Sequence, residues 1–165
     1  MKTLVLLTLL TGALSWAGAD FEGLPTGKES VPSSDEALEK EVLYLVNEVR
    51  RKRGLKPLLP QADLSRAARY HAKDMATDRY FEHDSMDRTA RGTLKKLANF
   101  GVRLSRFADL GGSWAENIAQ GHPDAESVMR AWMRSSGHRR NILSSRYRYL
   151  GVGYGDGYWV QDFGD

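Results

Sequence analysis

The side chains best suited to chemistry in this chain are its four histidines, His71, His83, His122 and His138. An imidazole binds transition metals and exchanges protons near neutral pH, so each histidine is a candidate ligand or general base. None lies in a local metal motif such as His-Glu-x-x-His, so a metal site would have to be assembled from distant segments. The chain contains no cysteine, which excludes thiol catalysis and cysteine-ligated zinc.

The four histidines differ in their sequence surroundings. His71 lies on the apolar stripe of a predicted helix, and we expect it to bond a backbone carbonyl in the core. His122 precedes a proline in a predicted loop and is expected to be solvated. His83 and His138 each follow a segment that ends a predicted helix, where a histidine either serves a site or hydrogen-bonds a loop. The residues alone leave both interpretations open for this pair.

Two predicted helices come before His83. Ser33 and Glu36 form a predicted capping box for the first helix, whose apolar face recurs at helical spacing until Gly54 ends it. The second helix is expected over about 63–80. Its buried stripe contains several alanines, which would let another element approach closely.

Two further helices are predicted between His83 and the C-terminal region. A short one is expected over 92–99, with Leu94 and Leu97 facing inward. Asp124 is a predicted N-cap for the next helix, which we expect to stop at Gly137, immediately before His138.

The C-terminal region changes from helical to strand periodicity. Residues 149–154 and 158–163 flank Asp156-Gly157, a dipeptide that strongly favours a two-residue hairpin. A further strand is predicted over 117–119. The 158–163 segment is aromatic and apolar instead of alternating, which indicates a strand that is covered on both faces. The predicted class is therefore α+β, with helices on both sides of a small antiparallel sheet.

The N-terminus has the pattern of an export signal. Lys2 precedes an apolar run over 4–14, and Ala17-Gly18-Ala19 is a small-residue cleavage site. The run is shorter than the ~20 residues that span a bilayer, and the well-formed cleavage site favours a cleaved signal over an uncleaved anchor. We therefore expect a signal peptide at 1–19, a flexible leader at 20–34 with little to bury, and one domain at 35–165. The predicted location is secreted or periplasmic.

Charge gives a second set of candidates. The formal net charge is only +3, so an exported chain of this kind is not expected to bind nucleic acid. Basic residues nevertheless gather late in the sequence, and such a patch could attract envelope polymer or anionic lipid. The alternative is that basic residues complement a helix dipole. The patch consists of Arg139, Arg140, Arg146 and Arg148.

Three segments together resemble the CAP superfamily (cysteine-rich secretory proteins, antigen 5, pathogenesis-related 1) in its bacterial SCP-like form. They are Tyr80-Phe81-Glu82-His83, Trp114-Ala115-Glu116-Asn117-Ile118-Ala119, and the twelve residues from Trp132 to Leu143. The resemblance covers about 37–163. It implies the α-β-α sandwich of the CAP fold, with helices on both sides of the small antiparallel sheet.

The resemblance also implies a central cleft lined by two histidines and two glutamates. By motif, the histidines correspond to His83 and His138, and one glutamate corresponds to Glu116. The other glutamate position is occupied by Ser135 in this chain, so the set of four is incomplete. Asn117 and Asn141 are expected to satisfy backbone groups around the cleft.

Two imidazoles and one carboxylate can hold a divalent metal such as zinc and leave the fourth position to water. Alternatively, Glu116 could act as a general base with no metal. The function expected first is a secreted, non-enzymatic CAP domain whose cleft (His83, Glu116, His138, Ser135) binds a divalent metal or a small ligand. The alternatives are an exported metal-dependent hydrolase acting on peptide or cell wall, and an adhesion module that binds envelope polymer or lipid through the arginine patch.

Overall fold

The computed structural model of the protein describes residues 24–109 and 111–165, so the predicted signal peptide at 1–19 lies outside the described residues. Both helices and strands are present, which confirms the α+β class. No helix in the described part is long and apolar enough to cross a membrane. In chain order the elements are α1 (Glu36–Arg51), β1 (Leu59–Pro60), α2 (Ala62–Asp78), β2 (Ser85–Arg88), β3 (Leu94–Ala98), α3 (Phe100–Phe107), β4 (Trp114–Gln120), α4 (Ala125–Arg134), α5 (Ser136–Ile142), β5 (Tyr149–Gly155) and β6 (Tyr158–Gly164).

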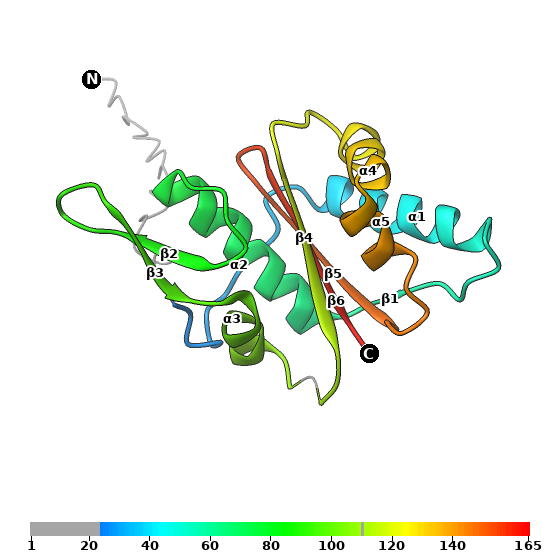
Figure 1. Ribbon diagram of the computed structural model, residues 1–165, viewed down its shortest axis with the longest axis horizontal. Coiled ribbons are helices and arrows are strands. Elements are labelled where there is room, and N and C mark those ends of the chain that lie inside the picture. Colours follow the sequence, from blue (N-terminus) through cyan, green and yellow to red (C-terminus); the bar gives the residue numbers. More distant parts are fainter. Residues whose placement is uncertain (1–23, 110) are drawn as a thin grey trace, which may run out of the picture.

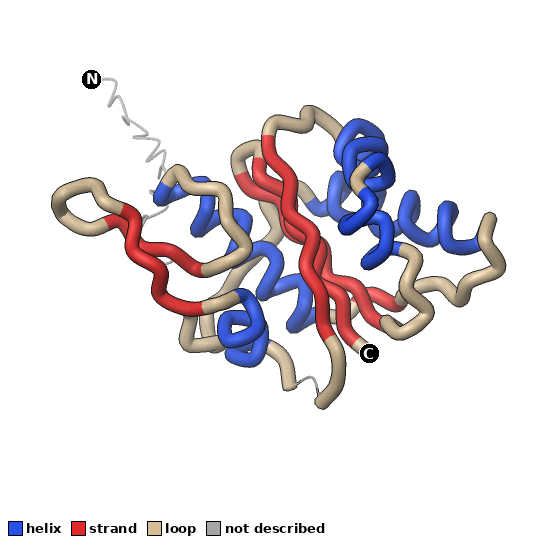
Figure 2. The backbone as a smooth tube through the Cα atoms, in the orientation of Figure 1, coloured by secondary structure: helices blue, strands red, loops and turns tan. Residues whose placement is uncertain are grey.

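The main sheet lies between two layers of helices, as predicted (Figure 1). Its strand order is β1-β5-β6-β4, antiparallel except for the two-residue β1, which pairs in parallel with β5. Helix α2 covers one face with α3 beside it, and α1, α4 and α5 cover the other (Figure 2). The strand β4 forms one edge of this sheet.

Helix α2 lies unusually close to the sheet. A Cβ atom at Gly151 would come within 2.1 Å of the Leu64 carbonyl carbon, and one at Gly153 within 2.3 Å of that of Ala68. Glycines in β5 and alanines in α2 therefore face each other, which confirms the expectation that the small stripe of this helix admits a close neighbour.

Two local predictions at the C-terminal end are confirmed. Asp156 and Gly157 form the hairpin turn with φ values of 47° and 85°, the left-handed geometry that a type I′ turn requires. Asp124 caps α4 by accepting from the Ser127 amide at 2.7 Å. The helix ends at Arg134, however, because extended backbone at Ser135 separates it from α5. Gly137, the predicted stop, lies within α5.

Two other local predictions are wrong. The N-cap of α1 is Asp35, whose carboxylate accepts from the Leu38 amide at 3.0 Å, instead of a Ser33–Glu36 box. The region predicted as a helix over 92–99 is a strand, β3, which pairs with β2 in a separate hairpin (Figure 1). Leu94 and Leu97 are three residues apart, a spacing that is compatible with either a helix or a strand in so short a segment. The pairing of this segment with β2 makes it a strand. The neighbouring helix, α3, starts only at Phe100.

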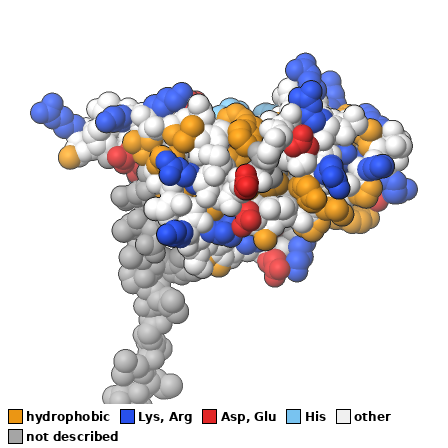
Figure 3. Space-filling model, turned by 90° about the horizontal axis from the view of Figure 1, so that it is seen from below, with side chains coloured by type: hydrophobic (Ala, Val, Ile, Leu, Met, Phe, Trp, Pro, Cys, Tyr) orange, Lys and Arg blue, Asp and Glu red, His pale blue; other side chains and the backbone are white. Residues whose placement is uncertain are grey.

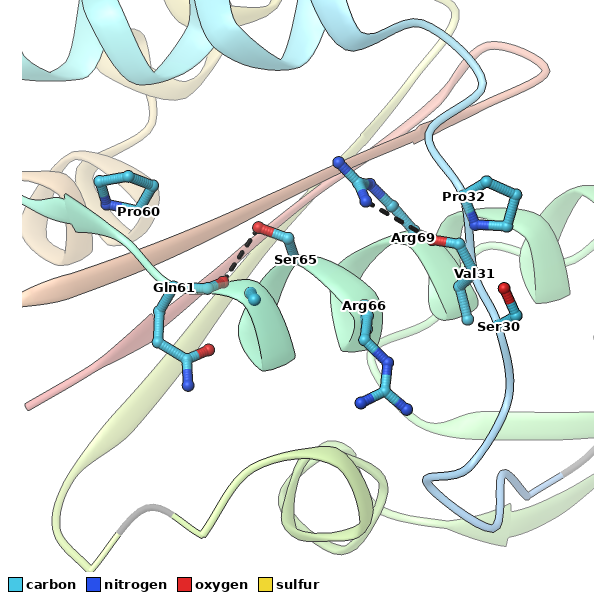
Figure 4. A pocket seen from close by; sticks show the side chains of 9 residues that line it. Ser30, Val31, Pro32, Pro60, Gln61, Ser65, Arg66 and Arg69 are labelled. Carbon is cyan, nitrogen blue, oxygen red and sulfur yellow. Dashed lines mark hydrogen bonds between the residues drawn. The ribbon is translucent and has the colours of Figure 1, made fainter.

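The described part of the predicted leader, 24–34, packs against α2, so the expectation that it buries little is wrong. Val31 is buried among α2 and α3 side chains. Its carbonyl accepts from Arg69, and the Pro32 carbonyl accepts from Lys73 at 2.9 Å. Figure 4 shows the bond from Arg69 to the Val31 carbonyl at the wall of a cavity of about 580 Å³, which lies between the leader and the start of α2. Arg69 is also paired there with Glu39, at 2.6 Å.

Candidate functional site

The predicted site glutamate lies on the edge strand and points toward α2. Glu116 is opposite Asp162 in the β4–β6 register, and its side chain is on the same face as Ile118 and Val160, which pack on α2. Only 1% of the Glu116 side chain is exposed. A carboxylate at this depth needs cationic or hydrogen-bonding partners to remain ionised.

The main partner of Glu116 is Arg103 of α3. Its side chain is fully buried, and Nη2 forms an ion pair with Glu116 Oε2. Its Nη1 donates to the His83 carbonyl at 2.9 Å and to Ser85 Oγ at 3.3 Å. Arg103 therefore neutralises the glutamate and also fixes the backbone that presents His83.

Sequence reasoning did not single out Arg103. The available signal was its position beside Leu104 and four residues before Phe107, a spacing that places a charged side chain on a buried helical face. The signal was missed because a helix was predicted over 92–99, whereas α3 spans Phe100–Phe107.

His83 completes the cluster. Its Nδ1 lies 2.9 Å from Glu116 Oε1, and 49% of its side chain is exposed. Since an ionised carboxylate only accepts, Nδ1 is the donor, and Nε2 bonds no residue in the described part of the chain. The hydrogen bond to Glu116 raises the pKa of His83 above its ordinary value. Burial alone would raise the pKa of Glu116, but the Arg103 charge, with His71 and His83, lowers it to about 2.

A second carboxyl group, which was not predicted, adjoins this cluster. Asp162 is fully buried, and neither of its carboxyl oxygens has a hydrogen-bond partner in the described part of the chain. Burial raises the pKa of Asp162 well above its ordinary value, and the Glu116 charge raises it further. The pKa values of Glu116 and Asp162 are therefore displaced in opposite directions, downward for Glu116 and upward for Asp162. The sequence offered one signal for this group, because Asp162 is a charged residue within a segment, 158–163, that is mostly aromatic and apolar.

The core assignment of His71 is confirmed. The side chain is fully buried, and Nε2 lies 2.9 Å from the Glu82 carbonyl oxygen. Burial lowers the pKa of His71 to about 3, so this ring is neutral. It supports the segment that leads to His83.

His138 lies on α5, which packs on the other side of the sheet edge. Burial lowers the pKa of His138, and the His83 charge lowers it further. The His138 carbonyl accepts from Asn117 at 3.2 Å, and Asn117 also accepts from Asn141 at 2.9 Å. The structural role predicted for both asparagines is thus confirmed. Ser135 ends α4, with its amide bonded to Ala131.

The predicted metal ligands do not form a three-ligand set in this arrangement. Among the described residues, no three His, Cys, Asp or Glu side chains are grouped so that they could hold a metal ion. Both oxygens of Glu116 are engaged within the chain, one by His83 and the other by Arg103.

The predicted arginine patch divides into two parts. On α5, Arg139 donates to the Met133 carbonyl at 2.8 Å, and Arg140 is exposed. Arg146 and Arg148 lie in the loop before β5 and line a separate cavity. Neither Arg139 nor Arg140 is among the residues that line this cavity.

Comparison with known proteins agrees with the fold and the site motifs. The family model described as "Cysteine-rich secretory protein family" matches residues 43–163. The chain is 40% identical over 136 residues to the uncharacterized protein YkwD of Bacillus subtilis, covering 81% of this chain and 49% of that protein. The chain thus spans about half the length of this relative.

Solved structures from bacteria are similar as well. An extracellular protein containing an SCP domain from Bacillus anthracis superimposes with a TM-score of 0.68 at 29% identity, covering 82% of this chain and 45% of that one. An outer surface protein from Borrelia burgdorferi gives a TM-score of 0.64 at 21% identity, covering 82% of this chain and 98% of that one, a likeness of fold alone.

Proposed function

The chain belongs to the cysteine-rich secretory protein (CAP) family in its bacterial form, and we propose that it is an exported binding domain, not an enzyme. Its ligand in the cleft is a divalent cation held by His83 and His138. Export is supported by the sequence pattern at 1–19 and by similarity to an extracellular protein that contains an SCP domain.

The observation that supports this proposal best is the hydrogen bond between Glu116 and His83. Its bond to His83 Nδ1 orients the imidazole and leaves Nε2 to face a ligand, which is the arrangement seen where a carboxylate supports a metal-binding histidine. Two imidazoles suit zinc and similar divalent transition metals, with solvent or a small polar ligand completing the coordination.

The contacts of Glu116 with His83 and Arg103 also make a hydrolase a poor alternative. A general base works best with a pKa near the working pH, whereas the pKa of Glu116 is about 2 and both of its oxygens are occupied. The position where the family pattern has a second glutamate is Ser135. A cation in this cleft would therefore lack a neighbouring group to activate its bound water.

Calorimetric titration of zinc into the protein tests the proposal. We expect binding to the unaltered protein, strong loss in the His83→Ala/His138→Ala variant, and no change in the control His122→Ala. Affinity should fall below about pH 6.5, because protonated imidazole does not bind metal. Zinc affinity that is equal in all three proteins, or constant down to about pH 5, would contradict the proposal.

A further inference from the structure

A cavity of about 700 Å³, whose lining includes neither His83 nor His138, lies between the loop after α1 and the loop before β5. The two loops run side by side in Figure 1, and the Leu59 amide donates to the Arg148 carbonyl at 2.8 Å. Cavities that bind small molecules have volumes of roughly 300–1,000 Å³, so this one is large enough for a ligand.

Arg50 of α1 is the buried cation of this cavity. It is 1% exposed, and its guanidinium bonds three backbone carbonyls, those of Lys56, Ile142 and Ser144, each at 2.8 Å. These bonds join the two loops. Within the described residues, Arg50 forms no ion pair with a carboxylate, and burial is what lowers its pKa. Buried charges are normally paired, so an unneutralised guanidinium here favours an external anion.

Three exposed cations line the same cavity, namely Lys56, Arg146 and Arg148. No Asp or Glu is among the lining residues that the structure describes. The acidic group that acts nearby is Asp165, which influences the pKa of Tyr147 and accepts from the Ser113 amide at 3.0 Å. The charged residues that line the cavity are therefore all cationic.

The cavity also has an apolar side. Leu59 is 53% exposed, and Tyr147 lies on the wall beside it. Figure 3 shows Lys and Arg side chains over the right-hand end of the molecule next to an apolar area. A suitable ligand therefore combines an anionic group with a less polar part.

We propose that this cavity binds a soluble phosphate ester, with Arg50 at its base and Lys56, Arg146 and Arg148 around its opening. Phosphate presents several acceptor oxygens, which suit the planar fork of a guanidinium better than a single carboxylate does. The sugar or glycerol part of the ester contacts Leu59 and Tyr147. This site is independent of the histidine cleft and needs no metal.

Calorimetry with glycerol 3-phosphate and with a short poly(glycerol phosphate) chain tests the proposal, in buffer containing a metal chelator. Arg146→Gln/Arg148→Gln should weaken binding by at least about tenfold, since hydrogen bonds to charged groups are lost. Arg134→Gln/Arg140→Gln removes the same charge outside the cavity and should change the affinity by less than about twofold. His83→Ala/His138→Ala should bind phosphate esters normally, which separates this test from that of the proposed function.

Three outcomes would overturn the proposal. The first is no saturable binding of either phosphate probe to the unaltered protein. The second is an equal loss in the cavity variant and the charge-matched control, which would indicate diffuse attraction alone. The third is binding only to phosphatidylcholine vesicles that contain phosphatidylglycerol, which would assign these cations to a membrane surface.

Discussion

Two fully buried arginines of this protein are in opposite electrostatic situations. Arg103 is paired with Glu116, whose other oxygen accepts from His83, so that charge is neutralised within the chain. Arg50 bonds only backbone carbonyls and adjoins a cavity lined by further cations. The first arrangement stabilises a fixed geometry, whereas the second leaves positive charge for a ligand. Burial alone therefore does not distinguish a structural charge from a binding charge.

The largest expected effect comes from removing the neutralising partner in the first region. Arg103→Met leaves the Glu116 carboxylate buried without its cation, which should lower the free energy of unfolding by about 3–5 kcal/mol. Urea unfolding near pH 7 measures this loss. Arg106→Met, an exposed position on the same helix, is the control and should change stability by less than about 0.5 kcal/mol. Similar losses in the two variants would contradict the structural role of the pair.

Acid should disrupt the same region through Glu116. Its pKa is about 2 in the folded protein against 4.5 ordinarily, so its contribution is present above about pH 4.5 and is lost as the pH falls toward 2. The difference corresponds to about 3 kcal/mol. The measurement is the free energy of unfolding between about pH 5 and pH 2, and Glu116→Gln should lack most of this loss. An unchanged acid transition in that variant would contradict the assignment.

Asp162 should respond to pH in the opposite direction. Its raised pKa means that the folded protein retains a proton, so its contribution is present below about pH 3.8 and is lost as the pH rises toward the folded pKa. Asp162→Asn should therefore stabilise the protein near pH 7, by about 1–3 kcal/mol, because an amide takes up no proton on folding. Unfolding at about pH 4 is the internal control, where the gain should shrink. If Asp162→Asn is less stable than the unaltered protein at neutral pH, the Asp162 carboxyl group stabilises the fold and the prediction is wrong.

Local signals predicted part of this fold from the sequence. The β5–β6 turn follows from Asp156-Gly157, and the start of α4 from the capping of Asp124, because each depends on adjacent residues. The β2–β3 hairpin was missed because Leu94 and Leu97 are also compatible with a helix, and only pairing with Ser85–Arg88 makes them a strand.

In the candidate site, too, some residues could be predicted from the sequence and others could not. The family motifs identified His83 and Glu116, which are 33 residues apart and bonded to each other. Arg103 and Asp162 belong to no motif, and their effect arises from tertiary burial beside Glu116. Sequence patterns therefore located the imidazole and the carboxylate, but not the arginine that lowers the pKa of Glu116 or the carboxyl group whose pKa Glu116 raises.

The smallest expected effect on stability is at the cavity of Arg50. Arg146→Gln/Arg148→Gln should change the free energy of unfolding by less than about 0.5 kcal/mol without phosphate, since both side chains are exposed and pair with no described carboxylate. Added glycerol 3-phosphate should raise the melting temperature of the unaltered protein more than that of this variant, because a ligand stabilises only the state that binds it.

Thermal unfolding with and without the phosphate ester measures both quantities in one experiment, and Arg134→Gln/Arg140→Gln is the charge-matched control. A cavity variant that unfolds much more easily without phosphate would indicate that Arg146 and Arg148 are structural, like Arg103. A cavity variant that is as stable as the control yet fails to respond to phosphate would separate the two regions. In that case a buried cation with an internal partner supports the fold, and one without an internal partner supports binding.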